Sequence, residues 1–119
     1  MYEESILNTI KKMMGLEQDY TPFDTDLIMH INSVIMILRQ LGVGPSTGYA
    51  ITGSAETWGS YLGSNESLLE AVKSYIYLKV RTMFDPPSNS YVMDAIQKQL
   101  SEYEWRLNVE VDSGEVTNG

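Results

Sequence analysis

Apolar residues recur at three- and four-residue intervals in four segments of the chain, and this spacing constrains the fold more than any other feature. It places the apolar side chains on one side of an α-helix, whereas a half-buried strand would show strict alternation. The four segments cover approximately residues 2–14, 24–41, 66–84 and 90–107. Between the last two lie consecutive prolines, which cannot continue a helix. The sequence therefore predicts an all-α fold, a small bundle of about four main helices.

A long glycine-rich stretch, residues 42–65, separates the second and third helical segments. It holds six of the nine glycines but also several large apolar residues, including Trp58 and Tyr61. Loops of this length are uncommon and are usually functional or disordered. The aromatic content favours an ordered loop, with a short strand near residues 49–52 and one helical turn near residues 56–62.

The length of 119 residues fits a single domain with its own core. Residues 1–107 are expected to form the helical domain. After them, Leu107, Val109 and Val111 alternate with polar residues, which is typical of extended backbone. We therefore expect residues 108–119 to form an extended C-terminal arm that becomes ordered on a partner.

The chain carries 16 acidic and 8 basic residues, a formal net charge of −8. This balance argues against binding to free nucleic acid or to an anionic membrane, since both require clustered lysine and arginine. The longest apolar run, Val34–Leu38, is too short to span a bilayer. The chain has no cysteine, which excludes disulfides, thiolate metal sites and cysteine nucleophiles.

No group of residues predicts catalysis or cofactor binding. His30 is the only histidine, so a transition-metal site is not expected. Asp24 and Asp26 fit the preference of helix N-termini for acids better than an acid/base pair. The glycines of residues 42–48 lack the lysine of a phosphate-binding loop. We predict no catalytic, cofactor-binding or metal-binding residue.

The chain contains eight tyrosines, two tryptophans and two phenylalanines, more than the core of a small bundle needs. Aromatic residues, methionine and arginine are enriched in the cores of protein interfaces. We therefore predict a subunit of an assembly. The candidate residues for contact with another subunit or a partner are Met36, Ile37, Tyr49, Ile51, Trp58, Tyr61, Trp105, Arg106, Val109 and Val111.

Several short stretches are distinctive when they are taken together in their order and spacing: Ile10–Gly15, Phe23-Asp24, His30–Ser33, Leu38–Gly44, Thr57-Trp58, Val72–Arg81, Phe84–Pro87 and Glu104–Leu107. As a set, they resemble the head–tail connector family of tailed phages, also called neck, adaptor or DNA-packaging proteins. They span nearly the whole chain up to residue 107.

The resemblance implies a structural subunit of the virion neck, made in the host cytoplasm, which forms a ring of about a dozen copies. The ring would sit under the portal protein, extend the DNA channel used in packaging and ejection, and carry a downstream neck or tail-completion protein. Double-stranded DNA would pass through without specific binding, and no cofactor or membrane is implied. Four acids are candidates for lining the channel and repelling DNA phosphates: Glu66, Glu70, Asp94 and Glu102.

Other interpretations remain open at this point. The acids can simply keep the subunit soluble, which net charge does in any protein. A small acidic helical regulator that mimics DNA would be a monomer or dimer binding a basic protein. An enzyme with a carboxylate-bound metal would be stabilised by Mg²⁺ or Mn²⁺.

Overall fold

The computed structural model describes the backbone of residues 3–63 and 66–118, and the side chains of residues 3–63 and 67–111. The described chain forms five helices and no strand. They are α1 (Ile6–Met13), α2 (Asp24–Gln40), α3 (Trp58–Leu62), α4 (Glu66–Phe84) and α5 (Ser90–Asn118). The all-α prediction is confirmed, with four main helices and the short α3 at the predicted helical turn.

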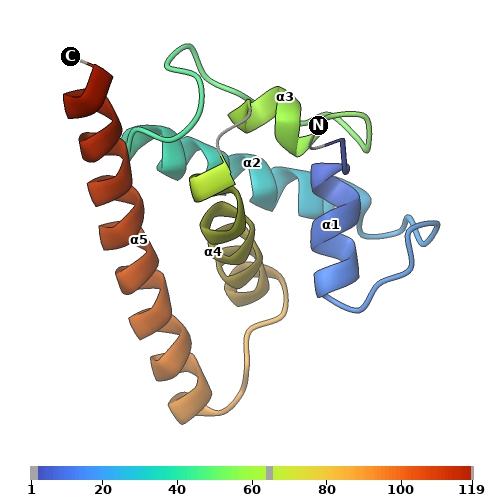
Figure 1. Ribbon diagram of the computed structural model, residues 1–119. Helices are drawn as coiled ribbons and strands as arrows, with labels where there is room; N and C mark the ends of the chain where they lie inside the picture. The colour runs from blue at the N-terminus through green and yellow to red at the C-terminus, as the bar shows by residue number, and fades with distance from the viewer. Residues whose placement is uncertain (1–2, 64–65, 119) are drawn as a thin grey trace.

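Helix α4 lies at the centre of the bundle, with α5 along one side and α2 along another (Figure 1). Helix α1 contacts both α2 and α4, and α3 contacts α4. The core consists of the apolar stripes that these helices turn toward each other, such as Ile31 on α2, Ile76 on α4 and Leu100 on α5. This burial stabilises each amphipathic helix more than its intrinsic propensity does.

Side-chain caps fix where two of the helices begin. The Ser5 hydroxyl accepts a hydrogen bond of 3.2 Å from the Asn8 amide at the start of α1. The Asn89 side chain accepts one of 2.8 Å from the Tyr91 amide at the start of α5. Such caps satisfy amide groups that the first turn of a helix leaves unpaired. Helix α5 therefore begins where the sequence predicts, whereas α1 begins at Ile6, four residues later than predicted, because Ser5 caps it.

The glycine-rich loop between α2 and α4 is ordered, as predicted, but contains no strand at residues 49–52. The side-chain amide of Asn32 on α2 takes the place of a neighbouring strand. It donates to the Ile51 carbonyl at 2.9 Å and accepts from the Ile51 amide at 2.8 Å. A single side chain thus satisfies both backbone groups of Ile51, which explains why this extended segment needs no strand partner.

The predicted extended arm after residue 107 is wrong, because these residues continue α5 to Asn118. The alternation of Leu107, Val109 and Val111 fits a helix equally well, since positions 107 and 111 are four residues apart. Leu107 is buried, Val111 is half-buried, and Val109 points outward. Nothing in the backbone marks a boundary between residues 107 and 108.

Gly42, just after α2, lets α5 approach closely. Its φ of +92° is in the left-handed region, and a Cβ atom there would lie 2.8 Å from a methyl carbon of Val111. A larger residue at this position would be strained and would also push α5 away.

Candidate functional site

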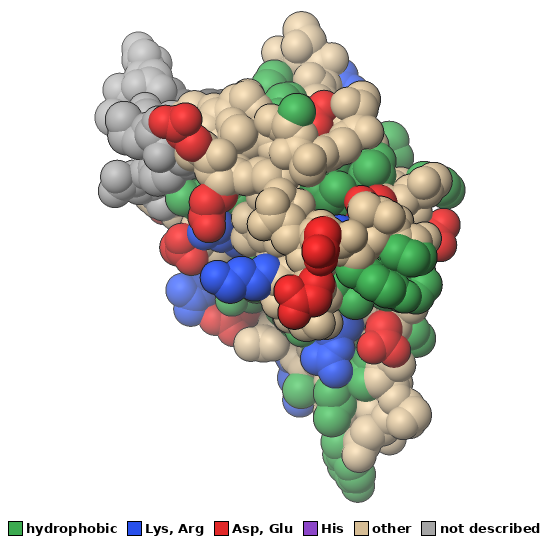
Figure 2. All heavy atoms as spheres, turned by 90° about the vertical axis from the view of Figure 1, so that its right-hand side faces the viewer, with side chains coloured by type: hydrophobic (Ala, Val, Ile, Leu, Met, Phe, Trp, Pro, Cys, Tyr) green, Lys and Arg blue, Asp and Glu red, His purple; other side chains and the backbone are tan. Residues whose placement is uncertain are grey.

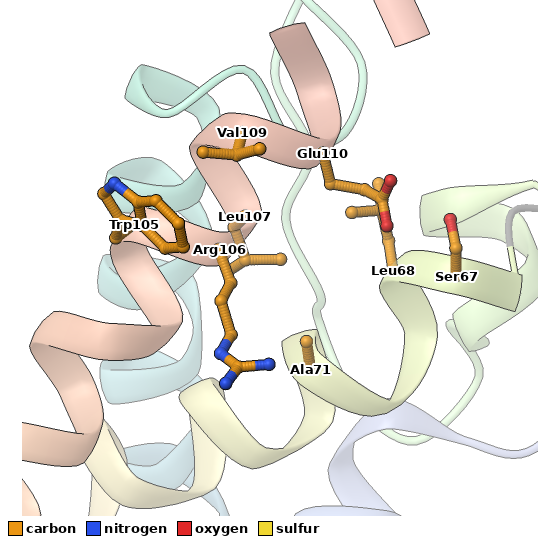
Figure 3. Close-up of a pocket in the computed structure, with 8 residues that line it drawn as sticks. All are labelled: Ser67, Leu68, Ala71, Trp105, Arg106, Leu107, Val109 and Glu110. Atoms are coloured by element: carbon orange, nitrogen blue, oxygen red, sulfur yellow. The ribbon is translucent and has the colours of Figure 1, made fainter. Parts of the chain in front are cut away.

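An open groove of about 290 Å³ lies between the beginning of α4 and the second half of α5 (Figure 3). It combines buried apolar residues with strongly exposed ones from two different helices. The lining residues are Ser67, Leu68 and Ala71 of α4 and Trp105, Arg106, Leu107, Val109 and Glu110 of α5.

The groove results from the way α5 turns successive residues in different directions. Leu107 points inward and is buried, so its neighbours in sequence point outward around it. Trp105 is 67% exposed, a large fraction for an indole side chain, and Val109 is also exposed. Together with Leu68 they give the groove apolar walls that a partner could cover.

Charged groups lie at both ends of the groove. In Figure 3 the Arg106 side chain extends from α5 toward Ala71, and Glu110 extends toward Ser67 and Leu68. Arg106 also forms an ion pair with Glu102, one turn earlier on α5, with a nitrogen–oxygen distance of 2.6 Å. Both partners are exposed, so this pair contributes little to stability.

Below these outward-facing residues, a partly buried hydrogen bond joins α4 to α5. The hydroxyl of Tyr75 on α4 donates to the carboxylate of Glu104 on α5 at 2.7 Å. Burial raises the pKa of Tyr75 above its ordinary value, and the hydrogen bond to Glu104 raises it further. Tyr75 therefore stays protonated and keeps donating, which fixes the position of α5 beside the groove.

A family model for phage connector proteins matches residues 6–114, most of the chain. The chain belongs to the phage connector protein family. The match extends past residue 107 into the last turns of α5. Comparison with curated proteins and with solved structures gave no match.

Membership of this family confirms the resemblance and supports a structural role for this connector protein in the neck of a phage particle. Among the described side chains, no three histidine or acidic groups come together where they could hold a metal ion. None of the helices, in the part of the chain that the structure describes, is both long and apolar enough to cross a membrane.

The groove brings together three of the residues that the sequence predicts to be in an interface, Trp105, Arg106 and Val109. Two others lie on α2, where Met36 is exposed and Ile37 is half-buried. Leu68 and Ala71 of α4 also line the groove, although the sequence does not predict them to be in an interface. Their place on the apolar stripe of α4 gave no signal that distinguished them from core residues.

The loop members of the predicted set lie elsewhere. Ile51, Trp58 and Tyr61 are buried in the core of this chain, so a partner cannot contact them in this conformation. Tyr49 is half-buried and stacks on Tyr61 with ring centroids 4.9 Å apart. Gly44 permits this packing, since a Cβ atom there would lie 2.6 Å from the Tyr61 ring.

The described acids among the four channel candidates are exposed, and two of them have basic neighbours. Glu70 forms an ion pair with Lys73 at 3.3 Å, and Glu102 pairs with Arg106. Asp94 is exposed on α5, and the side chain of Glu66 lies outside the described residues. Figure 2 shows acidic and basic side chains interspersed on the face that carries α1.

Proposed function

We propose that this connector protein is a head–tail connector subunit that forms a ring of about a dozen copies under the portal protein of a tailed phage. The ring extends the DNA channel and carries the next neck or tail-completion protein. The match of the connector family model to residues 6–114 carries this proposal.

The groove between α4 and α5 supports the proposed ring, because it offers a surface through which one subunit can contact its neighbour. Exposed tryptophan beside an apolar pocket is typical of the residues that dominate binding energy at interfaces. In a ring, each contact joins two different surfaces of the same protein. Met29 and Met36 are both exposed and lie two turns apart on α2, so they offer an apolar surface that can bind the groove of the neighbouring subunit.

The same proposal gives the exposed acids a function. Glu66, Glu70, Asp94 and Glu102 face the lumen and repel the phosphates of passing DNA, so that DNA slides without being held. Changing Glu70 and Asp94 together to lysine should leave ring assembly intact, because neither residue lines the groove or pairs with a residue that does, and should slow DNA ejection. Unchanged ejection would instead favour a role in solubility alone.

We propose in addition that the end of α5 contacts the portal. Removal of residues 112–119 keeps Val111, which packs beside Gly42, and so should leave the bundle folded. The truncated chain should fail to bind the portal in a pull-down assay. Normal binding would show that the portal contacts another part of the chain.

Light scattering coupled to size-exclusion chromatography tests the central proposal. We expect a ring, either for the protein alone or after mixing with the portal, and Trp105→Ala should prevent its formation. Tyr91→Ala is the matched control, because Tyr91 is also an exposed aromatic residue of α5 but lies outside the groove. A monomer or dimer under both conditions would contradict the ring and favour a small acidic regulator.

A further inference from the structure

A second aromatic surface lies far from the groove, where the loop between α1 and α2 meets the end of α4. Tyr20 and Phe23 have ring centroids 5.7 Å apart, and Phe23 meets Phe84 edge-to-face at 5.1 Å. We call these three residues the aromatic platform. The imidazole ring of His30 lies beside Phe84, with ring centroids 6.4 Å apart.

The aromatic platform is open to solvent. Tyr20 is 44% exposed and Phe23 is 37% exposed, while Phe84 is half-buried beneath them. Phe84 lies seventeen positions after Ser67 of the groove on α4, about 25 Å along the helix axis. The α1–α2 loop lies at the right of Figure 1, away from α5, so the platform and the groove are separate surfaces.

A buried lysine holds the aromatic platform in place. The Lys11 ammonium group, with its side chain 1% exposed, donates to the Gln18 carbonyl at 2.9 Å and to the Tyr20 carbonyl at 2.6 Å. It also forms an ion pair with Asp24 at 2.9 Å. These contacts tie the loop to both α1 and α2. The rings are therefore positioned before any partner arrives, which lowers the entropic cost of binding.

Three exposed acids lie close in sequence to the residues of the aromatic platform. Asp19 precedes Tyr20, Asp26 lies one turn after Phe23 on α2, and Asp85 follows Phe84. Arg81 lies one turn before Phe84, and the charge of Lys11 is balanced by Asp24. Figure 2 faces the side of the molecule that carries the α1–α2 loop and shows exposed hydrophobic side chains with acidic and basic ones beside them.

We propose that the aromatic platform binds an arginine-bearing apolar segment of a partner protein. A guanidinium group can stack on the exposed rings of Tyr20 and Phe23 through a cation–π interaction. The carboxylates of the three acids can accept its hydrogen bonds, and the apolar neighbours of the arginine can cover the rest of the rings. This surface requires neither the groove nor the ring assembly, so it stands apart from the proposed function.

The probe is an acetylated and amidated pentapeptide, Leu-Arg-Leu-Arg-Leu, titrated into the full ¹⁵N-labelled chain and followed by NMR. We expect shifts concentrated at the amides of Tyr20, Phe23 and Phe84. The same peptide with glutamate in place of arginine should cause none of them. Tyr20→Ala should weaken binding about threefold, because a cation–π partner at an exposed site is lost. Asp26→Asn should weaken it less and reduce its dependence on salt.

Two further variants separate positioning from contact. Lys11→Met should lower the affinity for the peptide, and the remaining chemical shift changes should spread along the α1–α2 loop, because the carbonyls of Gln18 and Tyr20 lose their hydrogen-bond donor. Lys11→Arg should restore part of the affinity. Trp105→Ala, an exposed aromatic change at the groove, should leave peptide binding unaltered. The amide spectra of the free variants show whether each is folded.

Three results would overturn the proposal. One is an equal response to the arginine and glutamate peptides, and another is a set of shifts centred on the groove. The third is occupation of the platform by a second copy of the chain, seen as concentration-dependent shifts of the same amides without peptide.

Discussion

The two tryptophans of this connector protein have opposite environments. The one next to an irregular loop is buried, and the one in a regular helix is exposed. Trp58 follows an irregular glycine-rich loop, yet it is 0% exposed, and its indole nitrogen donates to the Thr9 hydroxyl at 3.0 Å. Trp105 lies in the middle of a regular helix, yet most of its surface is in solvent.

This contrast separates folding from recognition in the molecule. The Trp58 region is joined to the N-terminal segment by backbone hydrogen bonds, from Ile6 to Glu56 at 3.0 Å and from Trp58 to Glu4 at 3.1 Å. The loop thus closes the core of the bundle. Around Trp105, the neighbouring residues Glu104 and Leu107 pack against the rest of the bundle, whereas the Trp105 side chain itself is mostly in solvent and leaves a surface for a partner. Four substitutions test this division, and Trp58→Ala should have the largest effect on stability.

Trp58→Ala should lower the free energy of unfolding by about 3–5 kcal/mol, because it removes a large buried side chain and leaves a cavity. It also leaves the Thr9 hydroxyl without its indole donor. Urea unfolding followed by circular dichroism measures the change. A loss below about 1 kcal/mol would mean that the loop can move away from the core at little cost, and the contrast with Trp105 would fail.

Tyr75→Phe should cost about 1–2 kcal/mol, since it removes a hydrogen bond to a carboxylate but keeps the buried ring. The pH dependence gives a second test. Because the folded-state pKa of Tyr75 is raised, its contribution is complete below the ordinary tyrosine pKa of 10.0 and is lost as the pH rises above it. Tyr61, whose pKa burial also raises, contributes in the same direction.

The wild-type protein should therefore lose more stability than Tyr75→Phe between neutral and strongly alkaline pH. Urea unfolding of both proteins at matched pH values measures the difference. Identical pH profiles would show that the hydrogen bond between Tyr75 and Glu104 does not hold α5 in place beside the groove.

Glu56→Gln should cost less than about 1 kcal/mol, because the loop contact that it weakens is largely solvated. The Glu56 carboxylate accepts hydrogen bonds from the Thr52 hydroxyl at 2.8 Å and the Thr52 amide at 2.9 Å. Chiefly through the hydroxyl bond, its pKa is lowered from the ordinary value of 4.5.

A lowered folded-state pKa means that this contribution is present above pH 4.5 and is lost as the pH falls through the lowered pKa. The protection factor of the Thr52 amide, which is the intrinsic exchange rate at each pH divided by the measured rate, should therefore fall in the variant and, for the wild type, at acidic pH. Equal protection in both proteins at neutral pH would show that the loop is ordered without this contact.

Local signals in the sequence were sufficient to predict where the helices lie, but not which distant residues contact one another. Pro86 and the cap residue Asn89 act within one or two turns, so the end of α4 and the start of α5 could be predicted. The role of Asn32 could not, because its partner, Ile51, is 19 residues away. The burial of Lys11 also depends on a loop folding back over it, and no pattern in the sequence records that.

The candidate site was predicted in part for a related reason. Trp105 and Arg106 fall on the outward side of the helical pattern predicted for residues 90–107, so their exposure follows from helical periodicity. Val109 lies in the segment predicted to be extended, so its outward direction on α5 could not be inferred in this way. The loop residues have no period from which an inward or outward direction could be inferred. Trp58 and Tyr61 were therefore assigned to an interface by residue type alone, and residue type does not distinguish a core from an interface.

Trp105→Ala should change the free energy of unfolding least, by about 0.5 kcal/mol or less, because an exposed side chain contributes little to the stability of the folded state.

A variant with Trp58→Phe makes Trp105 the only tryptophan, so the fluorescence of Trp105 reports on the groove directly. In the free subunit, acrylamide should quench this fluorescence readily. After ring formation, or after mixing with the portal, quenching should fall sharply because a neighbour covers the indole. Tyr91→Ala in the same background should show the same protection. If the ring forms and Trp105 is still quenched as in the monomer, the groove is not the contact between subunits, and the exposed methionines of α2 become the surface to test next.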